Sequence, residues 1–296
     1  MFDEVRGNKF KSVLLMSFFI IIIGMLGAVL GMYYGSLSFG VVIAVLFSIV
    51  YALVGMYSGD KMILSMSGAR EVTKKEFPHL FHTVEGLAIA AGVPPPKAYV
   101  IDDTALNAFA TGRDPSHASI TVTTGLLKKL NRQELEGVIG HEMSHIKNFD
   151  IRFMMLTAIL IGIAVLLSDF LLRSLLWGGG GRNRESKSSG AMVLIVFALV
   201  LAILTPIIGE LIKLAISRRR EFLADASGAL LTRYPPGLAS ALKKISQDPD
   251  PLVDKANKAT AHLFISTPFR KTKGAMTRLF ATHPPIDERI KRLEEM

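Results

Sequence analysis

The sequence predicts an α+β domain with a small, mainly antiparallel sheet, attached to four transmembrane helices. Three observations lead to this prediction. Half of the 296 residues are hydrophobic, and the apolar residues gather in a few long runs. Roughly 170 residues lie outside those runs, which is enough for one domain with its own core. Within that part, short β-prone stretches precede a helical pattern over residues 131–150, in which apolar positions recur on one face.

The first apolar run has no charged residue between Ser12 and Gly59. A membrane span needs about 20 apolar residues, so this run is long enough for two spans, expected at 13–32 and 39–57. Gly35–Ser38 supplies the turn between them. The apolar stretch is too long for a cleaved signal peptide, and no cleavage site is evident. Residues 1–59 therefore form a transmembrane hairpin.

Gly27, Gly31 and Gly35, in the first span and the turn after it, are spaced four residues apart. This spacing allows helices to approach closely. Packing between the first two spans is the simpler use of these glycines, in preference to dimerisation.

A second hairpin is expected over residues 151–216. Its apolar runs are 153–168, ended by Asp169, and 191–209, which Pro206 would kink. The loop at 173–190 between them is rich in glycine and serine. Because the first of these runs is short, a re-entrant or shallow pair is the alternative to two full spans.

Residues 60–150 and 217–296 are expected to form one domain, which the second hairpin interrupts. The predicted elements of this domain are a helix at 76–91, strands at 97–101, 105–110 and 118–123, a helix at 235–246, and a last helix entered at Pro284 and Pro285. Residues 247–273 read as loops with a short helix, and the pattern assigns them no role.

The helix at 131–150 contains His141-Glu142-Met143-Ser144-His145. Two histidines four apart lie on one face of a helix, close enough to bind one zinc ion. Glu142 lies on the same half of the helix, where it could act on water as a general base without binding the metal.

A catalytic zinc normally has three protein ligands and one open position. The best candidate for the third ligand is Glu221, and Asp225 lies one turn further on the same helical face. Asp225 could accept the free ring N–H of His141 and fix its orientation. The alternative is that both carboxylates belong to a solvated charged face.

Four motifs together resemble the HtpX membrane metalloproteases, relatives of the CAAX prenyl-protein proteases. They are the segment from Asn107 to Gly112, the HEMSH motif, Arg220–Asp225 and Thr282–Pro285, in that order. The resemblance covers nearly the whole chain, including its hydrophobic segments. The resemblance implies a zincin-like, gluzincin-type fold and a zinc endopeptidase of membrane-protein quality control and stress response. It implies one zinc ion per chain, bound by His141, His145 and Glu221, with Glu142 as the base.

The same resemblance implies that Asn107, His283 and Arg289 lie near the scissile carbonyl. Asn107 would bind substrate main chain, His283 would stabilise the oxyanion, and Arg289 would support that arrangement. Considered alone, Asn107 reads as a turn or strand-end residue and His283 as a helix-entry residue. Implied partners are misfolded membrane proteins or unfolded proteins, the lipid bilayer and other quality-control proteases.

The distribution of Lys and Arg predicts the orientation in the membrane. Basic residues cluster at Arg6–Lys11, Lys61–Lys75 and Arg218–Arg220, whereas the 33–38 turn has none. This places both termini and the zinc on the cytoplasmic side of a multi-pass protein in the cell (inner) membrane. The basic residues in the 173–190 loop are the exception.

The net charge of +9 suits contact with anionic lipids. No basic stripe with interleaved aromatic residues indicates nucleic acid, and the absence of cysteine excludes disulfides and thiolate ligands. Two alternatives stay open: a membrane scaffold with a structural zinc, and a prenyl-protein processing protease.

Overall fold

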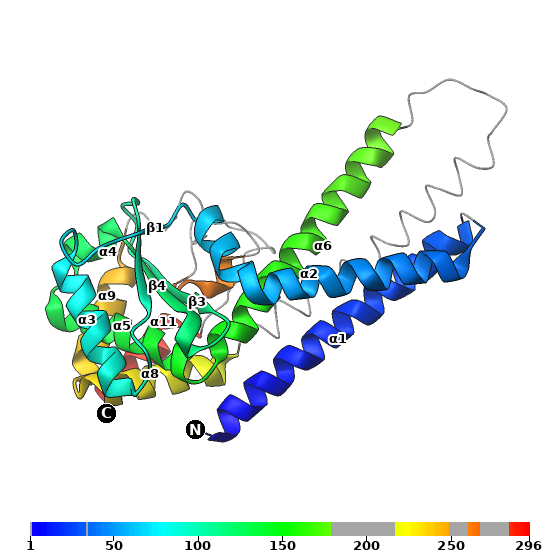
Figure 1. Ribbon diagram of the computed structural model, residues 1–296. Helices are drawn as coiled ribbons and strands as arrows, with labels where there is room; N and C mark the ends of the chain where they lie inside the picture. The colour runs from blue at the N-terminus through cyan, green and yellow to red at the C-terminus, as the bar shows by residue number, and fades with distance from the viewer. Residues whose placement is uncertain (1, 34, 179–216, 249–259, 267–283) are drawn as a thin grey trace.

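The computed structural model describes residues 2–33, 35–178, 217–248, 260–266 and 284–296. The fourth expected apolar run, 191–209, and His283 lie outside the described residues. Within them, a mixed sheet and a group of helices form one end of the molecule, from which long helices extend (Figure 1).

Two helices of the described chain are long and apolar enough to cross a membrane. They are α1 (Phe2–Tyr33) and α2 (Leu37–Met66), joined by a turn in which Ser36 caps α2. The α2 helix exposes a row of large apolar side chains, among them Phe39, Phe47 and Val50. Such a surface is unsuited to water and suits lipid. The two expected spans are thus confirmed as helices, each longer than its apolar run.

Glycines let α1 and α2 lie in close contact, as the sequence predicted for two of the three. A Cβ on Gly27 would lie 2.5 Å from the carbonyl oxygen of Gly40, and one on Gly31 would lie 3.0 Å from the Cα of Gly40. Gly35 serves a different purpose. Its φ of +85° forms the turn between the helices, a conformation that favours glycine.

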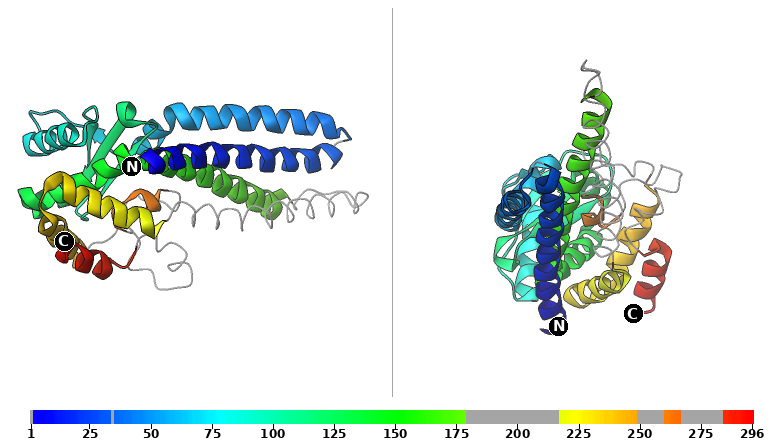
Figure 2. Two further views of the ribbon diagram at one scale, coloured as in Figure 1. Left: turned by 90° about the horizontal axis from the view of Figure 1, so that it is seen from below. Right: turned by 90° about the vertical axis from the view of Figure 1, so that its right-hand side faces the viewer.

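The third apolar run lies in α6 (Asp150–Gly178). The apolar segment was expected to end at Asp169, but the helix continues past this residue to Gly178. Its first turns pack against α1 through Phe153, Leu156 and Leu160. Figure 2 shows α1, α2 and α6 leaving the rest of the molecule in a common direction.

The sheet has four strands in the order β1-β2-β4-β3. These are β1 (Arg70–Glu71), β2 (Lys97–Ile101), β3 (Ala108–Gly112) and β4 (Ala118–Thr123). The β1–β2 and β3–β4 pairs are antiparallel, but β2 and β4 are parallel. The expected mainly antiparallel sheet is therefore mixed, because the β3–β4 hairpin places β3 at the outer edge and leaves the other side of β4 for β2.

The predicted strands at 97–101 and 118–123 are confirmed, whereas the strand expected at 105–110 begins three residues later. Side chains bind the main chain that precedes it. The amide of Ala105 donates to Asp103 at 2.8 Å and that of Leu106 to Asp248 at 2.9 Å. These bonds replace the ladder there.

Eight shorter helices complete the described chain, and seven of them lie outside the 247–273 region. These seven are α3 (Pro78–Ala91), the 3₁₀ helix η1 (Pro115–His117), α4 (Thr124–Lys129), α5 (Arg132–Lys147), α8 (Arg218–Thr232), α9 (Pro235–Ser246) and α11 (Ile286–Glu294). A further 3₁₀ helix, η2 (Ala261–Leu263), lies in the described part of the 247–273 region. The predicted helices around 76–91, 131–150 and 235–246, and the last helix after Pro285, are confirmed.

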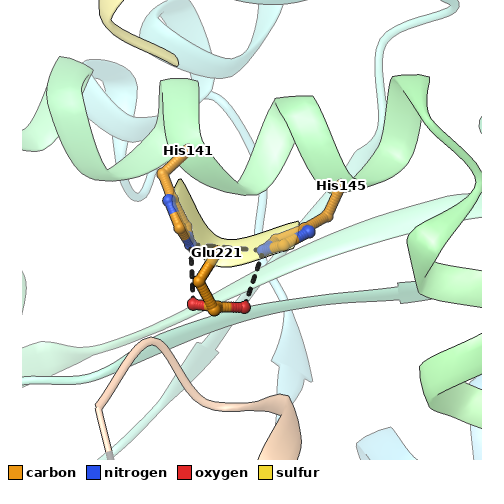
Figure 3. A group of neighbouring side chains, drawn as sticks. All are labelled: His141, His145 and Glu221. Carbon is orange, nitrogen blue, oxygen red and sulfur yellow. Dashed lines mark hydrogen bonds and ion pairs between the residues drawn. The ribbon is translucent and has the colours of Figure 1, made fainter. Parts of the chain in front are cut away.

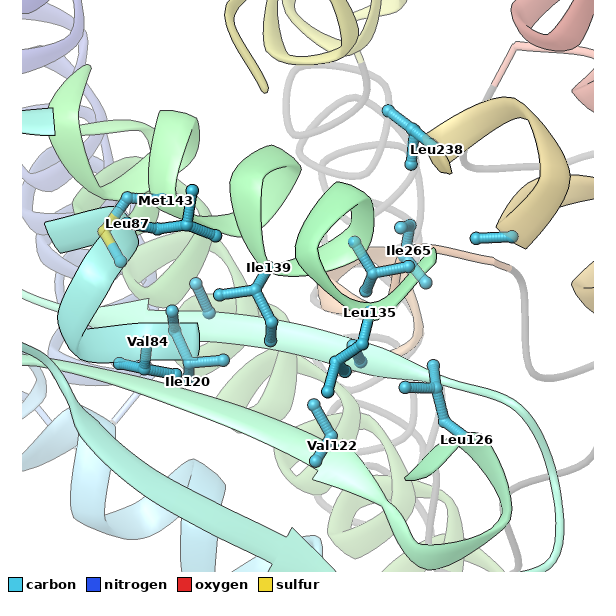
Figure 4. Close-up of a cluster of buried hydrophobic side chains, with 14 of the residues drawn as sticks. Val84, Leu87, Ile120, Val122, Leu126, Leu135, Ile139, Met143, Leu238 and Ile265 are labelled. Atoms are coloured by element: carbon cyan, nitrogen blue, oxygen red, sulfur yellow. The ribbon is translucent and has the colours of Figure 1, made fainter. Parts of the chain in front are cut away.

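The α5 helix lies at the centre of the core. Asn131 and Glu134 form a capping box at its start, which satisfies amides that a helix end leaves free. One face packs through Leu135, Ile139 and Met143 against the sheet and α3, while α9 contributes Leu238 (Figure 4). Burying each such side chain contributes roughly 1.5–3 kcal/mol.

The crossing of α5 and α8 requires a glycine on each helix. A Cβ on Gly228 would lie 2.8 Å from the main-chain nitrogen of His141 and 2.9 Å from the carbonyl carbon of Gly140. Backbone cannot yield to such a contact as a flexible side chain can. The close crossing brings the first turn of α8 to the face of α5 that bears the two histidines.

We expect Gly228→Ala to lower the melting temperature, because overpacking typically costs about 1–3 kcal/mol. The matched control is Gly86→Ala in α3, where nothing lies within 4 Å of the added Cβ. There the change should raise stability by up to about 1 kcal/mol through helix propensity. Thermal unfolding of both variants measures the difference. Equal stability gains would show that the helices do not need this close crossing.

Candidate metal centre

The α5 helix presents His141 and His145 on one buried face. Their Nε2 atoms lie 3.2 Å apart, and the two rings are nearly perpendicular, at 89°. A tetrahedral zinc ion with bonds of 2.0–2.1 Å separates two nitrogen ligands by roughly 3.3 Å. The two rings are therefore already spaced to share one ion.

Glu221 brings a carboxylate to the same point from the first turn of α8 (Figure 3). Its oxygens lie 3.8 Å from His141 Nε2 and 3.6 Å from His145 Nε2. All three ligand atoms lie within 4.8 Å of one another, and all three residues are buried. Two imidazoles and a carboxylate are a donor set that zinc accepts, so the residues fit a metal ion.

Behind His141 stands a buried pair of opposite charges. The Nδ1–H of His141 donates to Asp225 at 2.9 Å, and Arg289 donates to both oxygens of Asp225 at 2.7 and 2.8 Å. Arg289 also donates to the carbonyl of Ile265 at 3.1 Å and lies 3.8 Å from Glu221. The α11 helix thus supports the metal-ligand side of the site.

A second carboxylate, which the sequence did not predict, lies behind His145. The Nδ1–H of His145 donates to Asp150 at 3.0 Å, and both residues are buried. A hydrogen-bonded carboxylate fixes which ring nitrogen carries the proton and leaves the other free to bind metal. The available signal was an aspartate at the head of an apolar run, where an unpaired carboxylate would be costly.

Glu142 faces the same space without joining the ligand cluster. It is 1% exposed, and its Oε1 has no hydrogen-bond partner among the described residues. Burial and the charge of Glu221 raise its pKa to about 7, opposed by His145 and by a hydrogen bond from the main-chain amide of Ala110. An unsatisfied, buried carboxylate oxygen beside a metal site is suited to hold and deprotonate a water molecule.

The ionisation of the histidines follows from their surroundings. Burial opposes the charged form of His145, yet Asp150 and Glu221 together raise its pKa to about 9. Burial lowers the pKa of His141, although Asp225 opposes the shift. Burial alone would raise the pKa of Asp225, but Arg289 and His141 lower it to about 2. The carboxylates around His145 therefore favour positive charge at this point of the site.

The edge strand β3 runs beside this site and carries residues that the sequence singled out. The amide group of Asn107 donates to the carbonyl oxygen of Ser266 at 2.9 Å. The amide of Ile265 donates to Ala108 at 2.9 Å. A short stretch of main chain is thus bound along the start of β3.

The structure brings together His141, Glu142, His145, Glu221, Asp225 and Arg289. Asn107 lies immediately before the neighbouring edge strand β3 and donates to the carbonyl of Ser266. His283 lies outside the described residues.

Comparisons with known proteins agree on one family. Residues 74–296 match the model of peptidase family M48. The chain is 45% identical over 295 residues to the Protease HtpX homolog of Dictyoglomus thermophilum, covering 100% of this chain and 94% of the relative. It is 41% identical over 298 residues to the Protease HtpX homolog of Ligilactobacillus salivarius, covering both chains fully.

A solved structure, that of S. mikatae Ste24p, has a similar fold. The match has a TM-score of 0.51 and 18% identity, and it covers 99% of this chain and 66% of that one. The similarity supports the fold alone.

Removing one charge of the Asp225–Arg289 pair should destabilise the domain. We expect Arg289→Met to cost about 3–5 kcal/mol, because it leaves a buried carboxylate unpaired. The control is Arg292→Met on the same helix, whose ion pair with Glu288 is half-exposed and should contribute about 0–1 kcal/mol. Thermal or denaturant unfolding measures both. Equal effects of the two variants would contradict a special role for the buried pair.

Proposed function

Because this chain belongs to peptidase family M48, we propose that it is a zinc-dependent endopeptidase whose site is the cluster around His141, His145 and Glu221. The chain is a membrane-associated metalloprotease. We propose in addition that the metal is zinc, and we propose a role for each residue of the site and a class of substrate. The observation that carries the proposal is a buried three-donor cluster, beside which one carboxylate oxygen of Glu142 has no partner in the part of the chain that the structure describes.

Three protein donors suit a catalytic site, since a structural zinc site is normally closed by four. Among the described residues, the cluster contains three. This count favours a hydrolase over a scaffold with structural zinc. A bound zinc ion supplies a water molecule of lowered pKa and polarises the scissile carbonyl.

The protein's own contribution centres on Glu142. With a pKa of about 7, its carboxylate can accept the proton of the attacking water and then deliver it to the departing amine. Asp150 and Asp225 hold the rings of His145 and His141 through their Nδ1–H groups. Both imidazoles then present Nε2 toward the metal without reorganising.

For the substrate, we propose an extended peptide that lies along β3. An edge strand offers main-chain groups to a peptide of any sequence. Asn107 already binds main chain, through the carbonyl of Ser266, which is the kind of contact proposed for it with substrate. Oxyanion stabilisation by His283 belongs to the same proposal, and Arg289 acts there through Asp225.

The substrate class follows from where the site lies. His145 is five residues before the start of α6, whose first turns pack against α1. A peptide bond near the membrane surface could reach the metal without leaving the bilayer completely. This supports cleavage of misfolded or damaged membrane proteins, in agreement with the HtpX name of the relatives. Prenyl-protein processing, the alternative left open above, rests only on the motifs of the family resemblance.

The proposed location is the cell (inner) membrane, with both termini and the metal on the cytoplasmic side. The N-terminal end of α1 and the domain lie at the same end of the molecule, while the turn between α1 and α2 lies at the other (Figure 1). Basic residues occur at the first end and not in residues 33–38, as the charge rule requires of cytoplasmic segments. We propose four membrane spans in total, two in a hairpin at 1–59 and two in a hairpin at 151–216. Residues 60–150 and 217–296 then form the two parts of the protease domain.

Glu142→Gln should retain near-stoichiometric zinc and lose proteolysis by about 10²–10⁴-fold, the usual contribution of a general acid–base group. Glu221→Ala should instead lose zinc. Metal analysis and cleavage of an unfolded protein substrate, on the same preparations, separate the two effects. The control is Glu136→Gln on the same helix, which removes only the pair with Arg132 and should leave both readings unchanged. Normal turnover in Glu142→Gln would remove Glu142 from the mechanism.

Single-cysteine labelling tests the orientation, and it is clean because the chain has no cysteine. Ser38→Cys, exposed at the start of α2, should react in intact cells with a reagent that cannot cross the membrane. Ala90→Cys, exposed on α3, should react only after lysis. Labelling of both positions in intact cells would contradict the proposed orientation.

A further inference from the structure

The first membrane helix places a buried amide beside the metal site. Asn8 on α1 is 1% exposed. Its Nδ2 donates to Asp150 Oδ1 at 2.6 Å and to the carbonyl oxygen of Asn148 at 3.0 Å. Both partners are acceptors, so only a group with two N–H donors satisfies them together. The residue type is therefore matched to its position.

Asp150 connects this amide to a metal ligand. One carboxylate oxygen accepts from Asn8, and the other accepts from His145 Nδ1 at 3.0 Å. With both oxygens engaged, the carboxylate cannot rotate without breaking a bond. The orientation of the His145 ring thus depends on a contact more than 130 residues away in the sequence.

Asn8 also secures the bend between α5 and α6. Asn148 is the C-cap residue of α5. The next residue, Phe149, has a φ of 60°, a strained conformation for a bulky residue. Asn8 binds the carbonyl on one side of Phe149 and the carboxylate on the other. The ammonium of Lys9 lies 4.3 Å from the centre of the Phe149 ring.

Docking of α1 does not by itself require this amide. Leu15 and Phe19 pack against Phe153, Leu156 and Leu160 of α6, which supplies apolar contact. Asn8 even leaves its own Oδ1 buried without a partner among the described residues. A buried, unpaired acceptor is unfavourable, and apolar contact between α1 and α6 alone would not involve this cost.

We propose that Asn8 is a positioning residue for the metal site, acting through Asp150 on His145, so that α1 is part of the metal-binding machinery as well as a membrane anchor. This inference rests on the proposed metal site. Arg220 also acts on Asp150, through its charge, with its guanidinium 5.0 Å from the ring of Phe153. Its charge stabilises the carboxylate, whereas Asn8 sets the direction of the carboxylate.

The test measures zinc affinity by chelator competition on the full-length protein in detergent. Removing a group that orients a metal-binding histidine typically costs 10–100-fold in affinity. Asn8 contacts Asp150 and not the histidine itself, so for Asn8→Leu we expect a loss of about 10-fold in zinc affinity. Asn8→Asp should lose more, because it sets two carboxylates against each other. Absorption of the cobalt-substituted protein should change in both variants, since that spectrum reports the ligand geometry.

The matched control is Ser12→Ala, one turn along the same face of α1. Ser12 is buried and donates only within its own helix, to the carbonyl of Asn8 at 2.9 Å. Its removal should leave zinc affinity and the cobalt spectrum unchanged. If Asn8→Leu lowers the melting temperature of the metal-free protein but keeps wild-type zinc affinity and spectrum, Asn8 is a scaffold residue and the proposal is overturned.

A double-mutant cycle with Asp150→Asn shows whether Asn8 acts through Asp150. In the Asp150→Asn background, Asn8→Leu should cause little further loss of zinc affinity, because the two residues act as one unit. Additive losses would overturn the proposed route. Failure of the metal site itself looks different: the wild type would then bind no zinc, or Glu221→Ala would bind it as tightly as the wild type.

Discussion

The structure depends on how two buried histidine rings are held. Each ring gives its Nδ1–H to a carboxylate, His141 to Asp225 and His145 to Asp150, while the Nε2 atoms meet 3.2 Å apart. A buried carboxylate is stable only when its own charge and lone pairs are satisfied. Each therefore requires a further partner, and those partners determine where other helices must lie. Arg289 brings α11 to the first carboxylate, and Asn8 brings α1 to the second.

The same requirement joins the domain to the membrane helices. The α5 helix ends at Lys147, and after a bend of two residues α6 begins at Asp150. The helix that bears the two histidines and the membrane-directed helix are therefore fixed relative to each other at the candidate metal site. Gly55 and Gly59 of α2 allow Ile159 of α6 to approach closely. The three long helices thus form one packed unit with the site at its base, consistent with a protease that works at the bilayer surface.

The sequence predicted what local patterns encode. The capped α5 helix, the strands at 97–101 and 118–123, and the helix at 235–246 follow from periodicity, caps and turn residues. The parallel β2–β4 pairing could not be predicted, because register between strands separated by a third strand depends on tertiary contacts. The late start of β3 had the same kind of cause: the carboxylate of Asp248 binds the amide of Leu106 across the fold.

For the candidate site, spacing was informative within α5 and for the pair Glu221 and Asp225, whereas Arg289 was indicated only by the family resemblance. Asp150 was missed because a carboxylate five residues after a histidine has no recognised motif, and because its partner, Asn8, lies at the far end of the chain. Its position at the start of an apolar run was a hint, since such a charge must find partners. Asn8 itself gave no signal, because one amide among basic residues near the start of a membrane helix is unremarkable by composition.

The origin of these partners bears on how the site is assembled. The proposed ligands come from α5 and α8, which cross closely at Gly140 and Gly228. The residues proposed to orient them through Asp150 and Asp225 are Asn8 and Arg289. Contacts of such long sequence separation form late, since loop closure must precede them. On the proposed role of Asn8, the metal site reaches its full affinity only after α1 has docked on α6. A chain whose first helix is not yet seated would then hold its metal weakly, which limits proteolysis before the protein is in place.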